Sequence, residues 1–291
     1  MSESTILIVG ATGLLGNAFV ELFARSPGFR TVGAVRSLAG PARAFEHLDV
    51  TLMGGLDAES PDSLARVVAA AEPDVVVNCV GLIKQAGDAK DVMAAVPINT
   101  LLPHRLAALC AIAGARLVHV STDCVFSGAK GNYREDDFCD ADDVYGRSKL
   151  LGELHAAPAI TLRTSIIGHE LRAGASLLEW FLAQEGPVRG FTRAIFSGVP
   201  AVHLARIVRD HVLPDPALNG LYHVSAAPIA KFDLLQLIAE RYGKGIAIEP
   251  DDSLRIDRSL DSSRFRAATG YAPPPWPELI DEMHRHRPRG K

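Results

Sequence analysis

The sequence has few cysteines and no arrangement of them that suggests a cross-link or a metal site. Cys79, Cys110, Cys124 and Cys139 are far apart among 291 residues and form no CxxC pair. Neither a disulfide framework nor a structural zinc site is therefore indicated. The histidines form no HExxH pattern, so we predict no metal site.

The sequence also lacks an excess of basic residues and a long hydrophobic run. Thirty Lys and Arg residues stand against 34 Asp and Glu residues, which gives a net charge of −4. Such a balance does not favour binding to a phosphate backbone, so we expect no nucleic-acid polymer as a partner. No segment reaches the roughly 18 apolar residues of a membrane span, and the N-terminus lacks a basic leader. We expect a cytoplasmic protein without a membrane partner.

What the first 165 residues do contain is an alternation of short apolar runs and longer helical patterns. Apolar runs such as LIV, VVV and LVHV do not alternate with polar residues, which is typical of strands buried on both faces. This rhythm predicts an α/β fold with a doubly wound parallel sheet. The six predicted strands span 5–10, 29–35, 48–53, 74–80, 115–121 and 159–164.

From residue 166 to 291 the rhythm loosens, and we expect a smaller C-terminal α/β lobe that binds substrate. The chain could cross between this lobe and the first domain, 1–165. The predicted helices of the lobe span 176–184, 203–213, 232–243 and 278–285, and its predicted strands span 194–199 and 220–225.

The sequence GATGLLG follows the first predicted strand and opens a helix. Glycines at this spacing allow a tight turn and close approach of a pyrophosphate, whose charge the helix N-terminus stabilises. The motif predicts a Rossmann-type dinucleotide site. Its expected cofactor contacts are Gly10, Thr12, Gly13, Leu14, Leu15 and Gly16.

The end of the second predicted strand distinguishes the two nicotinamide dinucleotides. An acidic residue there would bind the ribose hydroxyls of NAD, whereas an arginine would meet the 2′-phosphate of NADP. The strand ends with Arg36 and Ser37, which favours NADPH over NADH. Asp57, after the third strand, is either a contact on the adenine side or a helix N-cap.

A tyrosine and a lysine occur four residues apart in DDVYGRSKLLGE. On a helix, Tyr145 and Lys149 would lie on the same face. An ammonium near a phenol favours the phenolate and lowers the phenol pKa, which suits proton transfer near neutral pH. The alternative is that both are ordinary residues of a helix surface.

Three segments together resemble a known family. GATGLLG, STDCVFSG at 121–128 and YGRSKLLGE at 145–153 are similar to the extended short-chain dehydrogenases/reductases, and more closely to the dTDP-4-dehydrorhamnose reductase branch. The resemblance implies that Tyr145 is the proton donor and that Lys149 activates it and binds the nicotinamide ribose. It also implies that Thr122 orients the substrate carbonyl.

The same resemblance assigns further residues and shows two departures. Asn99 would support the site, Cys79, Val80 and Gly81 would line the cofactor, and Thr122, Asp123 and Cys124 would contact substrate. Cys124 stands where the branch usually has tyrosine, and Ser127 where it usually has aspartate. The identity of the sugar is therefore left open.

The resemblance thus implies an NADPH-dependent reductase of a nucleotide-diphosphate 4-keto-6-deoxysugar. One alternative is an epimerase or dehydratase of the same fold, which Arg36 disfavours because such enzymes hold NAD tightly. Another is a non-catalytic NADP-binding subunit, since the branch includes a regulatory subunit of methionine adenosyltransferase. The family also suggests a homodimer.

Overall fold

The computed structural model describes residues 3–82, 90–171 and 176–287. The chain forms two compact units, and it passes between them several times. Unit 1 comprises residues 1–121, 142–162 and 216–221, and unit 2 comprises residues 122–141, 163–215 and 222–291. The expected assignment of 1–165 to cofactor binding and 166–291 to substrate binding stays a prediction about function.

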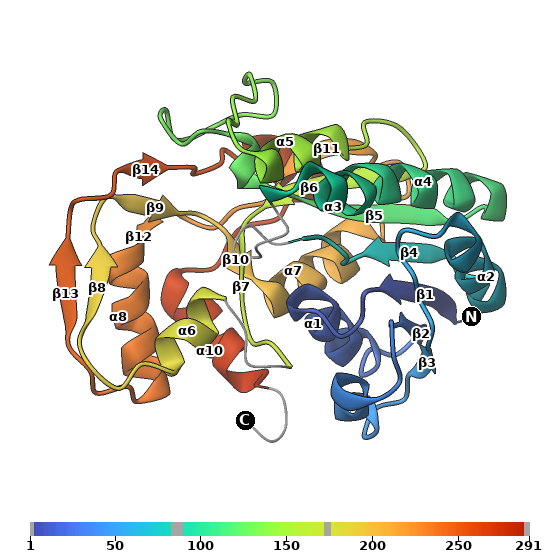
Figure 1. The fold of residues 1–291 in the computed structure, drawn as a ribbon, viewed down its shortest axis with the longest axis horizontal. Coiled ribbons are helices and arrows are strands. Elements are labelled where there is room, and N and C mark those ends of the chain that lie inside the picture. The colour runs from blue at the N-terminus through green and yellow to red at the C-terminus, as the bar shows by residue number, and fades with distance from the viewer. Residues whose placement is uncertain (1–2, 83–89, 172–175, 288–291) are drawn as a thin grey trace. The chain divides into compact units, whose positions relative to one another are not determined.

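A seven-stranded sheet forms the centre of unit 1 (Figure 1). The strand order is β11-β6-β5-β4-β1-β2-β3, and the five strands β1 to β5 pair in parallel. The strands are β1 (Ser4–Val9), β2 (Phe29–Ala34), β3 (Thr51–Met53), β4 (Val75–Asn78), β5 (Arg116–Thr122), β6 (Ala159–Thr164) and β11 (Gly220–His223).

The predicted doubly wound sheet is confirmed, but its strand count and one strand length are corrected. Six strands were expected, and the seventh is β11, which the sequence pattern placed in the C-terminal lobe. Periodicity identifies a strand but cannot say which sheet it joins. The strand expected at 48–53 is only Thr51–Met53, because residues 46–49 form a turn and a bend after a short 3-10 helix, η1 (Gly40–Phe45).

Helices cover the sheet because its strands are apolar on both faces. Leu7 and Val9 of β1 belong to one core cluster with Leu64 of α2 (Pro61–Ala71) and Leu106 of α4 (Leu102–Ala113). The neighbouring residues of β1, Ile6 and Ile8, are also fully buried. Since successive strand residues point to opposite faces, they lie on the face opposite α2 and α4. Helix α1 (Leu14–Phe23) also packs on β1 and β2.

The helix before β5 contains a π-helical turn. It runs as α3 (Val92–Ala95), the π segment η3 (Val96–Leu101) and α4, with prolines at 97 and 103. Proline lacks an N–H donor and interrupts regular hydrogen bonding, and π turns often occur at functional sites. By length and composition alone, the helical stretch Val92–Ala113 could cross a membrane, and 33% of its most apolar 18 residues are buried in the protein. Core helices of other proteins are also long and apolar enough to meet this criterion.

Unit 2 consists of short helices and small sheets. Its helices are η4 (Asp123–Val125), α6 (Leu177–Leu182), α7 (Ala201–Ile207), η5 (Val208–Val212), α8 (Lys231–Tyr242), α9 (Ser263–Thr269) and α10 (Trp276–Arg285). Two of its sheets have two strands each: β10 (Val199–Pro200) pairs with β7 (Ile166–Ile167), and β13 (Ile248–Asp251) pairs with β8 (Val188–Phe191). A third sheet has the strand order β12 (Ile229–Ala230), β9 (Ala194–Phe196) and β14 (Ile256–Asp257).

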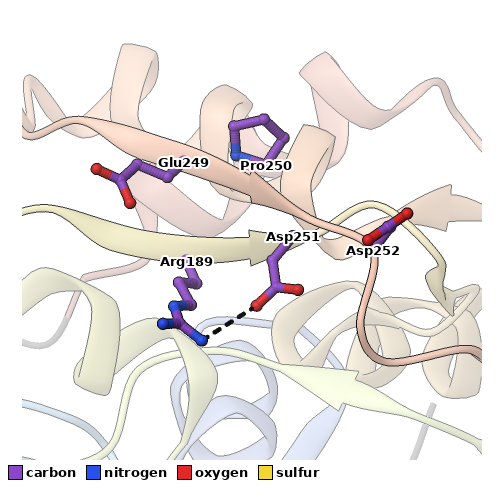
Figure 2. A pocket seen from close by; sticks show the side chains of 5 residues that line it. All are labelled: Arg189, Glu249, Pro250, Asp251 and Asp252. Atoms are coloured by element: carbon purple, nitrogen blue, oxygen red, sulfur yellow. Dashed lines mark ion pairs between the residues drawn. The ribbon is translucent and has the colours of Figure 1, made fainter.

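A surface pocket lies on β8 and β13 of unit 2 (Figure 2). Its charged side chains are Arg189, Glu249, Asp251 and Asp252, and Arg189 forms an ion pair of 3.6 Å with Asp251. Arg189 is 77% exposed, so solvent screens this pair. None of the residues predicted for cofactor or substrate lines this pocket.

Candidate active site

The glycine loop adopts the geometry that a dinucleotide site requires. Gly10 has a φ of +86°, which favours glycine, and its amide bonds to the Ala34 carbonyl at 3.0 Å. A Cβ at Gly16 would lie 2.2 Å from the Gly10 carbonyl oxygen, so only glycine lets α1 approach β1 this closely. Gly13 is the N-cap of α1 and is exposed.

These features fit a pyrophosphate at the N-terminus of α1. The nearest atom to a Cβ at Gly13 would be the Gly10 oxygen at an ordinary 3.5 Å, so this side of the loop is open. The amides at the start of a helix point outward and favour an anion. Thr12 and Leu14 are half-buried and Leu15 is buried beside this position.

Arg36 and Ser37 follow the end of β2 and lie on the surface. A residue that binds a cofactor phosphate has to be accessible in this way. Both are exposed, and the Ser37 hydroxyl accepts a hydrogen bond from the Ala39 amide at 3.2 Å. Asp57 is exposed and accepts from the Glu59 amide at 3.0 Å. The N-cap of α2 is Ser60, so the capping alternative for Asp57 was wrong by three residues.

The loop after β4 contacts both the glycine loop and the helix carrying Asn99. A Cβ at Gly10 would come within 2.6 Å of Val80 Cγ2, and the Cys79 amide bonds to the Val9 carbonyl at 2.9 Å. A Cβ at Gly81 would lie 3.5 Å from Asn99 Oδ1 and 3.8 Å from Lys149 Nζ. This loop therefore lies next to Gly10, Asn99 and Lys149, three of the residues predicted to contact the cofactor.

Asn99 links that loop to α5 (Val144–Leu151). It lies in the π segment and is 1% exposed. Its Oδ1 accepts from the Leu82 amide at 3.0 Å, and its Nδ2 donates to Ser148 Oγ at 3.2 Å. The predicted supporting position of Asn99 thus has a definite geometry, although its role in catalysis is untested.

Helix α5 carries Tyr145 and Lys149 on one face. Asp143 caps it by accepting a hydrogen bond from the Gly146 amide at 2.7 Å, which gives one of the aspartates before the tyrosine a structural role. Ser148 Oγ donates to the Tyr145 carbonyl at 2.9 Å. Tyr145 is half-buried, whereas Lys149 is only 6% exposed.

Lys149 is a buried cation with spare hydrogen-bonding capacity. Its Nζ donates to the Val120 carbonyl of β5 at 2.9 Å. Burial lowers the Lys149 pKa to about 8, and the charge of Glu153 acts in the opposite direction. An ammonium has three donors. Within the described ranges Val120 is its one hydrogen-bond partner, which leaves donors for a ligand hydroxyl.

Thr122 ends β5 and belongs to unit 2, where it caps the short helix η4. Its Oγ1 accepts a hydrogen bond from the Cys124 amide at 3.1 Å and donates one to Asp123 Oδ1 at 3.2 Å. Asp123 is 8% exposed, and burial raises its pKa while Arg258 opposes the shift. The Thr122 hydroxyl therefore contacts a carboxyl group that sequence spacing did not single out as its partner.

Two cations act on this part of unit 2 that the sequence analysis missed. Arg258 Nε donates to the Phe126 carbonyl at 2.7 Å, just after η4. Lys231 opens α8; burial lowers its pKa, whereas Asp123 and Cys124 oppose the shift. More than 100 residues separate these cations from Asp123, so no local motif could have revealed them.

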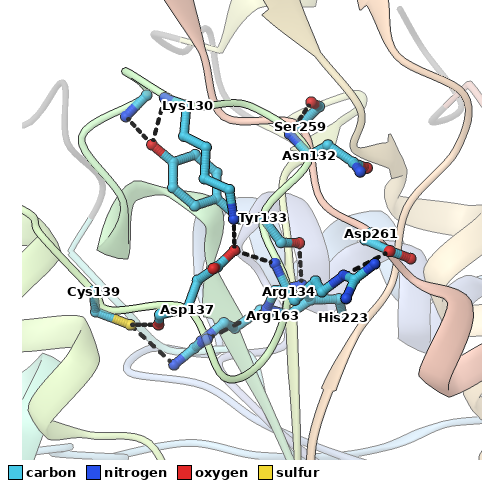
Figure 3. Close-up of polar contacts among 11 residues, drawn as sticks. Lys130, Asn132, Tyr133, Arg134, Asp137, Cys139, Arg163, His223, Ser259 and Asp261 are labelled. Atoms are coloured by element: carbon cyan, nitrogen blue, oxygen red, sulfur yellow. Dashed lines mark hydrogen bonds and ion pairs between the residues drawn. The ribbon is translucent and has the colours of Figure 1, made fainter.

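A polar network holds the segment that follows Thr122 (Figure 3). Tyr133 stacks on Phe126 with ring centroids 4.1 Å apart, and the Arg163 guanidinium lies 5.3 Å from the Phe126 ring centroid. Arg163 also contacts Cys139 Sγ and His223 Nε2, both at 3.3 Å. Burial, then the charge of Arg163, lowers the His223 pKa to about 4, so this imidazole is neutral and accepts from Arg163.

The two departures from the family pattern have different surroundings. Cys124 is half-buried beside Asp123. Ser127 bonds to Asp140 through both its amide, at 2.7 Å, and its hydroxyl, at 2.6 Å. In the described ranges no group of three or more His, Cys, Asp or Glu residues could hold a metal ion. This holds although His284 and His286 are spaced HxH.

Residues 4–287 match the family model described as the RmlD substrate binding domain. A dTDP-4-dehydrorhamnose reductase of Aggregatibacter actinomycetemcomitans is 25% identical over 306 residues, covering 97% of this chain and 98% of that protein. Methionine adenosyltransferase 2 subunit beta of Mus musculus is 34% identical over 318 residues, covering 96% and 90%.

Solved structures show the same fold. The dTDP-4-dehydrorhamnose reductase of Bacillus anthracis in complex with NADP has a TM-score of 0.77 at 21% identity and covers 98% of this chain and 100% of that chain. WbmG of Bordetella bronchiseptica in complex with NAD and UDP has a TM-score of 0.78 at 17% identity, covering 98% and 94%. The resemblance predicted from three motifs is confirmed: the chain belongs to the RmlD substrate binding domain family, within the dTDP-4-dehydrorhamnose reductase-like branch of the extended short-chain dehydrogenases/reductases.

Proposed function

We propose that this protein is an NADPH-dependent reductase of a nucleotide-diphosphate 4-keto-6-deoxysugar. Family membership and the reductase of A. actinomycetemcomitans support the reaction class. The observation that carries the proposal is the buried Lys149 ammonium on the same helix face as Tyr145. A merely structural surface lysine would not be buried with one backbone partner and a pKa of about 8.

In this proposal Tyr145 is the general acid. Its Oη donates a proton to the alkoxide that develops at the sugar carbonyl, while the Lys149 charge favours the phenolate left behind. Thr122 Oγ1 orients the carbonyl oxygen. NADPH supplies the hydride when it is bound. The charge on Lys149 is lost as the pH rises through about 8, so activity that depends on it should fall in that range.

The expected cofactor residues of unit 1 support NADPH as the dinucleotide. The pyrophosphate would lie on the Gly10 to Gly16 loop, and Arg36 would bind the 2′-phosphate. The NADP complex of the B. anthracis reductase supports this choice, and the NAD complex of WbmG keeps NADH as the alternative cofactor. Residues 1–165 would then bind the cofactor and residues 166–291 the substrate.

Charges in unit 2 support an anionic substrate. Arg258 and Lys231 both act on the Asp123 carboxylate, next to the hydroxyl that would orient the carbonyl. The Lys231 ammonium has no hydrogen-bond or ion-pair partner among the residues that the structure describes. A diphosphate would provide one. The UDP complex of WbmG is consistent with this substrate class.

The test is to incubate the protein with NADPH and a panel of dTDP- and UDP-linked 4-keto-6-deoxysugars. The proposal predicts loss of NADPH absorbance and formation of a reduced sugar with at least one of them. Sugar conversion without net oxidation of NADPH would instead identify an epimerase or dehydratase.

A second candidate is a regulatory subunit that binds NADP, favoured by the 34% identity to the mouse methionine adenosyltransferase subunit. It predicts tight cofactor binding without turnover on any sugar nucleotide. The buried Lys149 beside Tyr145 argues against it, because regulation alone does not require a tuned acid. A cytoplasmic location and a homodimer remain expectations that accompany either function.

A further inference from the structure

Two consecutive residues near the end of β5 bond to two side chains of opposite charge. One is Lys149 of α5, and the other is Glu153, which follows the C-cap of that helix. The Val120 carbonyl accepts from Lys149 Nζ at 2.9 Å, and Ser121 Oγ donates to Glu153 Oε1 at 2.6 Å. Lys149 and Glu153 are 6% and 4% exposed. A carboxylate so deeply buried requires a reason, since desolvation of a charge is costly.

The backbone fixes the position of Glu153. Gly152 is the C-cap of α5, and a Cβ there would lie 2.0 Å from the Asn99 carbonyl oxygen. The chain therefore packs directly against the π segment at Gly152, and the next residue, Glu153, lies beside β5. The Glu153 amide also bonds to the Leu150 carbonyl at 3.1 Å, which ties the backbone of Glu153 to the last turn of the helix.

Among the residues that the structure describes, the other ionisable groups near Lys149 supply no second negative charge. From β5, His119 is fully buried and its Nδ1 contacts Asn78 Nδ2 at 3.2 Å, which fits a neutral ring that accepts there. From α4, His104 Nε2 bonds to the Leu151 carbonyl at 2.8 Å. The segments α3 and η3, which also pack on α5, carry no charged side chain, and Tyr145 and Arg147 lie on α5 itself.

We propose that Glu153 is a positioning residue, held by Ser121, whose negative charge keeps the buried Lys149 ammonium protonated so that it can serve Tyr145 and the cofactor. This inference rests on the proposed function of Lys149. It explains why the carboxylate is buried next to the active helix rather than exposed as an ordinary end of a helix.

The electrostatics agree in sign. Burial lowers the Lys149 pKa to about 8, and within the described part of the chain Glu153 is the one charge that raises it. Burial, followed by the charge of Lys149, lowers the His119 pKa well below its ordinary value, so the histidine cannot replace the lysine as a cation. Without the Glu153 charge, Lys149 would lose its proton nearer to neutral pH.

The experiment is a titration of Lys149 that needs neither substrate nor turnover. The carbon-13 Cε resonance of Lys149, assigned by its absence in Lys149→Met, is followed with pH in the unmodified protein and in Glu153→Gln. Glutamine keeps an acceptor for Ser121 but removes the charge. We expect the midpoint to fall by about one pH unit or more, and NADPH affinity to decline at correspondingly lower pH.

A matched control separates charge from hydrogen bonding. Ser121→Ala removes the hydrogen bond but keeps the carboxylate, so the midpoint should fall by less than in Glu153→Gln. Should Glu153→Gln fail to fold, Glu153→Asp keeps the charge but withdraws it from Ser121 and should give the same intermediate shift. An unchanged midpoint in a folded Glu153→Gln or Glu153→Asp protein would overturn the proposal. If the midpoint moves but no sugar nucleotide is reduced, the proposed reaction fails while the pairing of Glu153 with Lys149 stands.

Discussion

Unit 1 and unit 2 both bury charged side chains, but they satisfy them differently. In unit 2, His203 contacts Glu282 at 2.7 Å and Tyr271 Oη at 2.9 Å, and Arg206 pairs with the same carboxylate at 2.9 Å. In unit 1, Lys149 and Glu153 bond to separate groups of β5.

We infer from this difference that the network in unit 2 is structural, whereas Lys149 belongs to the proposed active site. Both ring nitrogens of His203 are engaged within the protein, and they join α7 to α10. Lys149 instead makes one bond among the residues described and keeps donors for a ligand. Charged groups that pair with one another inside the protein stabilise the fold, whereas a buried cation with donors left over is typical of a site that binds a ligand.

The largest expected effect comes from removing the unsaturated cation. Lys149→Met should lower kcat/KM by about 1,000-fold or more, because it removes both the tuning of Tyr145 and a ribose contact. NADPH affinity should fall as well, and the pH at which any residual activity is lost should move upward with the phenol pKa of Tyr145. Steady-state kinetics and fluorescence titration with NADPH would measure these losses. Equal NADPH affinity in both proteins would mean that Lys149 does not contact the cofactor.

Breaking the network of His203, Glu282 and Arg206 should affect stability instead. Glu282→Gln should lower the free energy of unfolding by about 3 kcal/mol, because it leaves His203 and Arg206 without their carboxylate. Urea denaturation monitored by circular dichroism would measure this. NADPH affinity should not change, and a loss of NADPH binding by the folded variant would contradict the assignment of this network as structural.

The effect of Glu282→Gln should also depend on pH. Burial alone would raise the Glu282 pKa, but His203 and Arg206 hold it below its ordinary value of 4.5. A lowered carboxyl pKa stabilises the folded state above the unfolded value, and this contribution is lost as the pH falls through the folded pKa. The stability difference between the two proteins should therefore shrink below pH 4.5.

A smaller effect is expected from the exposed arginine at the end of β2. Arg36→Ala should remove most of the preference for NADPH over NADH, a change of about 2 kcal/mol from loss of a charge-assisted contact. Titrations with both cofactors at low and moderate salt would measure it. Equal affinities in the unmodified protein would show that Arg36 does not meet a 2′-phosphate.

The smallest effect should come from the ion pair between Arg189 and Asp251 in Figure 2. Arg189→Ala removes an ion pair to Asp251 in which the arginine side chain is 77% exposed, so stability should change by less than about 0.5 kcal/mol. Thermal unfolding and NADPH titration should both match the unmodified protein. A large loss would show that exposure is a poor guide to which charges matter here.

Periodicity and motif spacing predicted the parallel sheet, the glycine loop and the placement of Tyr145 and Lys149 on one helix face, because these are local properties. They could not place β11 in the central sheet, since strand pairing depends on residues far apart in sequence. The π turn around Asn99 was also missed, although Pro97 and Pro103 were a signal of irregular helix geometry.

The charged partners of the candidate site were the least predictable part. Glu153 follows Lys149 by four residues, which was a signal for a shared helix face, but its burial and its bond to Ser121 depend on packing against β5. Arg258 and Lys231 reach Asp123 only through the fold of unit 2. The roles of Thr122, Tyr145 and Lys149 in catalysis stay predictions until kinetics test them.

The most direct test of the central claim is single-turnover reduction by Tyr145→Phe, with NADPH and a 4-keto sugar nucleotide that the unmodified protein reduces. The ring still fills its place, so NADPH affinity should be nearly unchanged. Loss of the positioned acid should slow the chemical step by about 100-fold or more. Reduction at the unmodified rate would contradict the account, because the proton would then come from another group.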